Sequence, residues 1–127
     1  MQVEIFTLCD AAAVCSEKLN IPGTFDRLSF AKFPNESGAF AIATKVRCEP
    51  EEIGAHSMHV RWIDPDGGTV DDSDVCQFKV NFLEKRDIWH HIWRYDHKEF
   101  FGENEYVLQL IVYDVPLASV PLTVVLK

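Results

Sequence analysis

Apolar and polar residues alternate along short stretches of this chain, a pattern typical of strands with one buried face. Five segments show the alternation, and their apolar members are Phe40, Ile42, Val46 and Cys48; Met58, Val60 and Trp62; Cys76, Phe78, Val80 and Phe82; Tyr106, Leu108, Leu110 and Val112; and Val120, Leu122, Val124 and Leu126. Each apolar face needs a second layer to cover it. The pattern therefore predicts an all-β fold, a two-sheet antiparallel β-sandwich.

Further strands at 3–8 and 23–31 bring the expected number to about eight. Residues 102–114 and 115–126 form the closing pair, two strands joined by a tight connection. The proline, aspartates and glycines of 64–68 predict another turn between two strands.

Two stretches resist this interpretation. Residues 10–19 contain three consecutive alanines, and alanine has the best helix propensity, so a short helix is predicted there. Residues 87–95 fit either a strand or a helix capped by Asp87. Periodicity does not decide over so short a segment, but the aromatic and β-branched residues favour a strand.

Several short blocks occur in an order that resembles a family of small bacterial proteins of unknown function with an immunoglobulin-like β-sandwich fold. The blocks are 6–12, 18–26, the pair Phe33-Pro34, 54–56, 64–67, 102–106, and Asp114 followed by 120–122. The resemblance spans nearly the full length and implies an immunoglobulin-like sandwich with a strand at 88–95. The step from Gly102 to Tyr106 is longer than the family pattern. No activity follows, because the family has none assigned.

Composition and charge narrow the class of protein. With 127 residues the chain is expected to form a single domain, 1–127. The formal net charge is −8, and the 12 basic residues are scattered, which disfavours both nucleic acid and anionic membranes as partners. The start of the chain lacks the pattern of a signal peptide, and Asp114, Pro116 and Pro121 interrupt the last apolar run.

The cysteines Cys9, Cys15, Cys48 and Cys76 show no C-x-x-C spacing. In a chain without a secretory signal they are expected to be reduced thiols, which predicts a cytoplasmic protein. Cys9 stands beside Asp10, but no cysteine–histidine signature accompanies it. Cys48 and Cys76 share apolar strand faces and are expected to be inert.

Metal sites are also disfavoured. The histidines are His56, His59, His90, His91 and His97, and neighbours among them point to opposite faces of a strand, whereas zinc needs converging ligands. The acidic run of 64–74 lacks the closing glutamate and flanking helices of a calcium loop. We therefore assign no catalytic, cofactor-binding or metal-ligating residue and expect no cofactor.

One aromatic and apolar set fits a simple scaffold poorly. If each strand presents a second apolar face, the residues on those faces form a candidate partner surface: Trp89, Trp93, Tyr95, Val107, Ile111 and Tyr113. The alternative is that loops such as 10–19 cover these faces. The leading hypothesis is a non-enzymatic module that binds another protein, with a second copy of the chain as one candidate. The opposing hypothesis is a small enzyme or ligand-binding protein with a pocket at one end of the sandwich.

Overall fold

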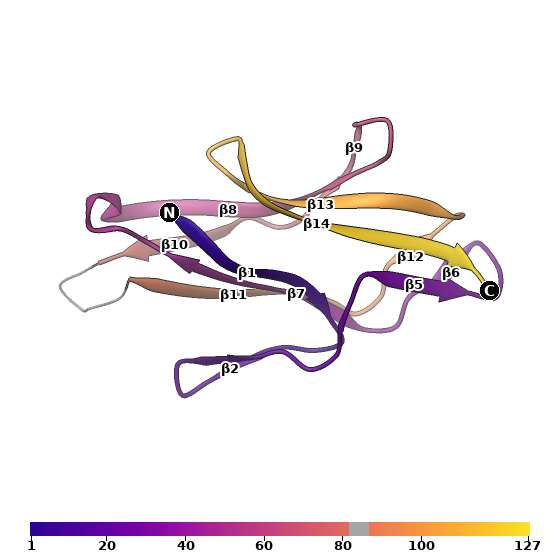
Figure 1. Cartoon of the computed structure of the whole chain (residues 1–127), viewed down its shortest axis with the longest axis horizontal. Helices are drawn as coiled ribbons and strands as arrows, with labels where there is room; N and C mark the ends of the chain where they lie inside the picture. Colours follow the sequence, from indigo (N-terminus) through magenta and orange to yellow (C-terminus); the bar gives the residue numbers. More distant parts are fainter. Residues whose placement is uncertain (82–86) are drawn as a thin grey trace.

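The computed structural model describes residues 1–81 and 87–127 and confirms the all-β class (Figure 1). Two sheets lie face to face. The first sheet contains, in order, β11 (Ile88–Tyr95), β7 (Phe40–Arg47), β1 (Gln2–Cys9) and β4 (Thr24–Phe25). The second contains β10 (Cys76–Val80), β8 (Gly54–Ile63), β13 (Asn104–Val112), β14 (Val115–Leu126) and β5 (Arg27–Phe30), with β9 (Thr69–Asp72) also paired to β8.

The strand pairs are antiparallel except β14 with β5, which run parallel. The region 23–31, expected as one strand, is divided at Asp26 between β4 of the first sheet and β5 of the second. A two-stranded pair, β6 (Asn35–Glu36) with β12 (Glu99–Phe100), lies beyond the sheets. A two-sheet, almost wholly antiparallel arrangement is thus confirmed, while immunoglobulin-like topology stays a prediction.

The core between the sheets is formed by the alternating apolar residues. Fully buried members include Ile42 and Val46 of β7, Val60 and Trp62 of β8, and Leu108 of β13. Phe40 stacks on Tyr95 with ring centroids 4.7 Å apart, which joins β7 to β11 by an aromatic contact on the inner face. Alternation therefore identified the inward-facing positions of these strands.

The short helix predicted at 10–19 is wrong. Residues there form a hairpin of β2 (Ala13–Cys15) and β3 (Lys18–Asn20), with Ser16 and Glu17 at φ 51° and 62°. Two consecutive positive φ values define the tight turn that matches the twist of a hairpin. Tertiary packing overrides alanine propensity here, because Ala12 and Leu19 pack against Ala41 and its neighbours on the first sheet.

The strand interpretation of 87–95 is confirmed. β11 pairs with β7 at eight consecutive positions without a register shift. Its odd-numbered residues face the second sheet, where the Trp93 indole N–H donates to the Asp74 carbonyl at 3.0 Å. Ile92, on the other face, packs against the outer cluster around Ala41 and Ala43.

The connection from β7 to β8 contains a single helical turn, η1 (Pro50–Glu52), which alternation did not predict. Glu49 and Glu52 form a capping box, and Pro50 occupies the first turn, where its missing N–H costs nothing. The Glu52 carboxylate also contacts the Met1 amine at 2.7 Å. Burial opposes ionisation of Glu52, but the hydrogen bond from Met1 and the backbone N–H of Glu49 outweigh it and lower its pKa.

The closing hairpin of β13 and β14 is confirmed, and the connecting residues are Tyr113 and Asp114 at φ 51° and 61°. The register shifts between Leu110 and Ile111. Leu110 is opposite Ala118 and Ile111 is opposite Pro116, so Leu117 is the extra residue of a bulge in β14. Simple alternation therefore fails in β14 near Leu117, while in β13 it holds through Val112, which lies in the core as predicted.

Candidate functional site

The aromatic half of the predicted partner surface faces the core. Trp93 is 6% exposed, and Trp89 and Tyr95 are half-buried against the inter-sheet cluster. Trp89 stacks on Phe78 at 5.5 Å between ring centroids. Ile111 is only 1% exposed. Trp93 and Ile111 are therefore too buried to contact a partner, Trp93 because β11 turns its odd-numbered side chains toward the second sheet.

Val107 and Tyr113 remain accessible, at 40% and 63% exposure. Val107 lies on the outer face of the second sheet, opposite Ile63 and Pro121. Tyr113 lies in the β13–β14 turn and not on a strand face as predicted. The six predicted residues are thus not brought together on one surface.

Exposed apolar side chains instead concentrate where β13 turns into β14. Tyr113, Val115 and Leu117 are 63%, 52% and 38% exposed, and Ile53 is 61% exposed. Ile53 is two residues from Ala55, whose carbonyl contacts the Tyr113 hydroxyl at 3.3 Å. We call Ile53, Tyr113, Val115 and Leu117 the hairpin-tip patch. Sequence reasoning missed Ile53, Val115 and Leu117. The register shift at Leu117 puts Val115 opposite core-facing Val112, so parity along β14 did not indicate its exposure.

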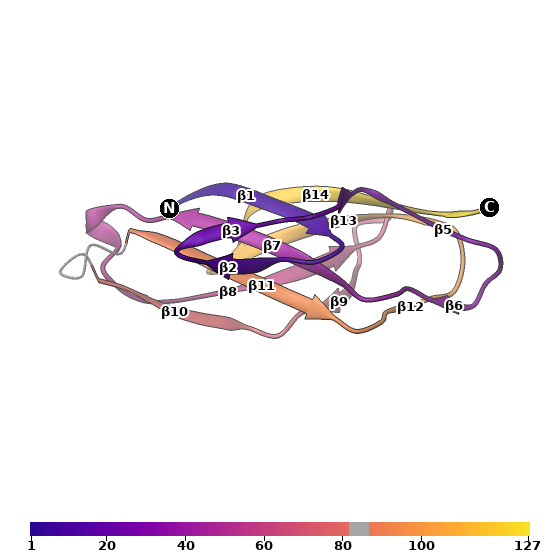
Figure 2. The same ribbon diagram turned by 90° about the horizontal axis from the view of Figure 1, so that it is seen from below.

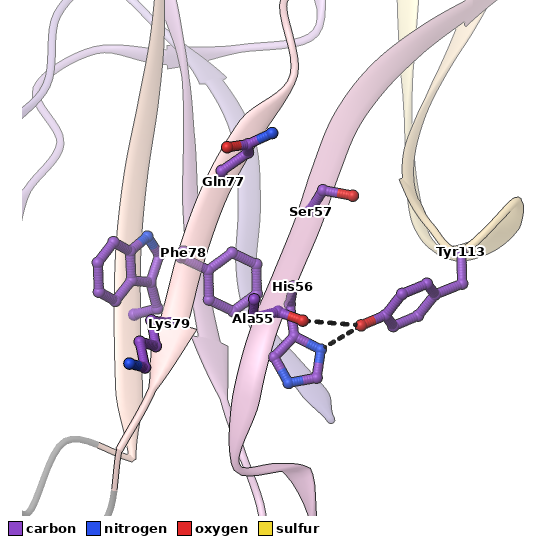
Figure 3. Close-up of a pocket in the computed structure, with 8 residues that line it drawn as sticks. Ala55, His56, Ser57, Gln77, Phe78, Lys79 and Tyr113 are labelled. Carbon is purple, nitrogen blue, oxygen red and sulfur yellow. Dashed lines mark hydrogen bonds between the residues drawn. The ribbon is translucent and has the colours of Figure 1, made fainter.

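A shallow depression of about 520 Å³ lies beside the patch, over the start of β8 and the adjoining part of β10 (Figure 3). The residues that line it are Ala55, His56, Ser57, Gln77, Phe78, Lys79, Trp89 and Tyr113. His56 stacks on Phe78 at 5.5 Å, and Tyr113 approaches the imidazole from the other side. Rings from three strands and one turn therefore lie in a row at this end of the sandwich.

His56 is held at both ring nitrogens. Its Nε2 lies 2.6 Å from the Glu52 carbonyl, which only accepts, so Nε2 carries the hydrogen. The Tyr113 hydroxyl then donates to Nδ1 at 2.7 Å. The backbone pairing of β13 with β8 ends at Val112 and Met58, and the contact of the Tyr113 hydroxyl with the Ala55 carbonyl lies beyond that point. The pair fastens the hairpin tip to β8.

This arrangement lacks the parts of a catalytic site. Both nitrogens of His56 are engaged, so the ring has no free lone pair to act as a base on a bound molecule. Ser57 follows His56 directly along β8 and so projects from the opposite face of the strand. The depression offers aromatic surface and one lysine, a lining better suited to binding a molecule than to catalysing a reaction.

The histidines do not converge. His59 lies 3.3 Å from Asp72, which also accepts from Arg61 at 3.2 Å. His90 and His91 point to opposite faces of β11, and burial lowers the pKa of both rings. Within residues 1–81 and 87–127, no group of three or more histidine, cysteine or acidic side chains is arranged to hold a metal ion.

The acidic loop uses its carboxylates internally. Asp64 accepts from the backbone N–H groups of Asp66 and Gly68 at 3.0 and 2.9 Å, which closes the predicted turn. Asp71 pairs with Lys98, whose Nζ lies 4.4 Å from the centroid of the buried Trp62 ring. These oxygens satisfy backbone donors and cations and do not surround a common point.

Three of the four thiols are buried, which makes them unsuited to nucleophilic chemistry. All four cysteines are free, and Cys15 alone is exposed. Burial raises the pKa of Cys9, Cys48 and Cys76, with a further contribution at Cys9 from Asp10. The Cys9 Sγ contacts the Ala41 carbonyl at 3.6 Å, so it is a packed core group.

No helix in the part of the chain that the structure describes is long and apolar enough to cross a membrane. Comparison with family models matches residues 4–125 to a family of unknown function (DUF6941). No curated protein and no solved structure matches the chain. The match covers almost the whole chain but brings no activity with it.

Proposed function

Since the chain belongs to this family of unknown function, we propose from its own geometry that it is a non-enzymatic module that binds another protein through the hairpin-tip patch. The observation that supports this is the concentration of exposed Ile53, Tyr113, Val115 and Leu117 at one end of the sandwich. Exposed apolar clusters commonly mark interaction sites. Tyrosine is also among the residues enriched at binding hot spots.

Charge indicates the chemistry of the partner. Asp114 lies within the patch, between Tyr113 and Val115, and exposed Glu51 stands two residues before Ile53. The chain as a whole carries a formal net charge of −8. A segment with apolar side chains flanked by Lys or Arg would complement this surface and be attracted to it over a distance. We also propose a cytoplasmic location, supported by the four unpaired thiols.

The proposal is tested by photo-crosslinking in the source cell. A photoreactive residue replaces Leu117, and the matched control replaces Glu105, which is exposed toward the far end of the same hairpin. A defined product is expected at position 117 and not at 105. The partner so identified is then purified, and Tyr113→Ser and Asp114→Lys should each weaken its affinity at least tenfold. Products of equal yield at both positions, or unchanged affinities, would overturn the proposal.

The depression supports a second candidate, a binding site for a small planar ligand at this end of the sandwich. Its aromatic lining of His56, Phe78, Trp89 and Tyr113 is the observation in favour. Indole serves as the probe in an NMR titration, with shift changes expected for the Ala55 and Phe78 amides. Shift changes scattered over the surface would exclude this candidate.

A further inference from the structure

The free edges of the two sheets differ in how they are protected against pairing with another strand. Unpaired edges are usually blunted by lysine, proline, bulges or short length. β10 is only five residues long and carries Lys79 at its fourth position. β14, where it extends beyond β5, carries Pro116 and Pro121, and β1 has a register shift near Glu4.

β11 has none of these devices. It ends the first sheet, is eight residues long, and stays in register with β7 throughout. Between Ile88 and Tyr95 there is no proline, lysine, aspartate or glutamate, and Arg94 is the one fully charged residue. In an antiparallel sheet, alternate residues of an end strand direct their N–H and C=O groups away from the sheet. The edge of β11 is therefore a template for another strand.

We propose that this edge pairs with the same edge of a second copy of the chain, antiparallel and about a two-fold axis at His91. Residues opposite each other then share a face. Trp89 meets Trp93 of the second copy, His90 meets Ile92, and Ile88 meets Arg94. No two full charges of like sign are opposed, and each copy satisfies the edge of the other in a closed, two-membered contact.

Electrostatics separates this contact from the one at the hairpin-tip patch. Each copy carries a formal net charge of −8, so the copies repel at low ionic strength and salt should strengthen their pairing. The same salt would weaken the binding of a basic partner at the hairpin-tip patch, because it screens the attraction between opposite charges. β11 belongs to the first sheet and the patch lies mainly on the second, so the two proposals succeed or fail independently.

The first test is sedimentation equilibrium of the unmodified chain from micromolar to millimolar concentration, at low and high salt. The mass should rise from 14.5 kDa toward twice that value, and more steeply in high salt. A monomer mass at millimolar concentration in high salt would overturn the proposal.

The second test locates the contact by disulfide cross-linking. A Cys15→Ser background removes the exposed thiol, and His91→Cys or Gln77→Cys is then added; Gln77 is the matched control on the edge of the other sheet. Residues facing each other across an antiparallel pair have Cα atoms about 4.5–5.5 Å apart, within disulfide reach. Mild oxidation should yield covalent dimer at least tenfold faster for position 91 than for 77. Equal rates would contradict the β11 contact.

A third variant keeps the test independent of cysteine chemistry. His91→Lys places two ammonium groups at the axis and should weaken dimerisation at least tenfold. Gln77→Lys adds the same charge on β10 and should leave the dimerisation constant unchanged. Near-UV circular dichroism verifies that both variants are folded. Equal weakening by the two lysines would show that net charge, and not the β11 edge, controls association.

Discussion

The outer faces of the two sheets are used in opposite ways. On the first sheet, Cys9, Ala41 and Ala43 are at most 2% exposed, because the 10–23 segment with the β2–β3 hairpin lies over them (Figure 2). On the second sheet, Val107 and Leu117 are 40% and 38% exposed. Both sheets have apolar residues on both faces; the chain covers Cys9, Ala41 and Ala43 on the first sheet but leaves Val107 and Leu117 of the second accessible.

This difference shows that an apolar outer face does not by itself indicate a partner. The first sheet presents small side chains, and Ala41 and Ala43 allow the covering segment to approach closely. The second sheet presents Val107 and Leu117 at its surface. A search for binding surfaces must therefore first account for cover provided by the chain itself.

The strongest test of this comparison places the same charge on each outer face. Ala43→Asp puts a carboxylate at a position with 0% exposure and should destabilise the fold by at least about 3 kcal/mol. Val107→Asp should change the free energy of unfolding by no more than about 0.5 kcal/mol. Urea denaturation measures both. Similar losses for the two variants would contradict the assignment of covered and open faces.

The cover itself is tested by Leu19→Ala. Leu19 is half-buried against Cys9 and Ala43, so removing its methyl groups should cost about 1–2 kcal/mol. The lost free energy should mainly weaken the packing of the β2–β3 hairpin on the first sheet. Cys9, which lies beneath it, should therefore react faster with a thiol reagent. Cys48 in the inter-sheet core serves as the internal control. Unchanged Cys9 labelling would mean that something other than the hairpin shields it.

The contacts of the Tyr113 hydroxyl hold the hairpin tip in place beside β8, and Tyr113→Phe tests them. The change removes the hydroxyl that contacts His56 and the Ala55 carbonyl, and should cost about 0.5–1.5 kcal/mol. Amide hydrogen exchange should quicken at Val112 and Val115 while that at Leu108 stays constant. Val115→Ala at the same turn should leave exchange at these positions nearly unchanged, which separates the hydroxyl from general disturbance of the tip.

The smallest effect is expected on the ionic part of the first sheet's outer face. The Arg47 guanidinium, with help from Lys45, lowers the pKa of Glu4 below its ordinary value of 4.5. A lowered pKa means that the contribution to stability is present above pH 4.5 and is lost as the pH falls through the folded value. The melting temperature of Glu4→Gln should therefore be slightly below that of the parent chain near neutral pH. In acid, where Glu4 is protonated, the two melting temperatures should be equal. A gap that widens in acid would reverse this assignment.

Alternation along β7, β8, β10, β13 and β14 was enough to predict most of the core side chains, because a strand has a fixed period of two. Of the predicted positions, Leu126 is 50% exposed and Phe82 lies outside the described residues. Alternation failed in β14 at Leu117, the extra residue of the bulge opposite Leu110 and Ile111. It also did not show which face of β11 is covered. The sequence pattern around Trp89 and Trp93 is the same whether these side chains pack against a second sheet or against a partner. The helix predicted at 10–19 was wrong because local propensity is a weaker influence than packing against the first sheet.

The candidate site was less predictable. Tyr113 was singled out from the sequence, but Ile53 is far from it along the chain and joins it only through the contact of Tyr113 with β8. The depression arises in the same way, from β8, β10, β11 and a turn that meet at one end of the sandwich. Long-range proximity of this kind leaves no periodic signal in a single sequence.

By itself, the sequence determined the all-β class and the inward face of most long strands, because these depend on local period and composition. Only the tertiary structure decided which apolar residues stay exposed. Exposure depends on what else folds over a face: the 10–23 segment buries the outer face of the first sheet, while the hairpin tip stays open. That decision lies in the pairing of distant segments, and it is what directs the search for partners to the hairpin-tip patch and to the edge of β11.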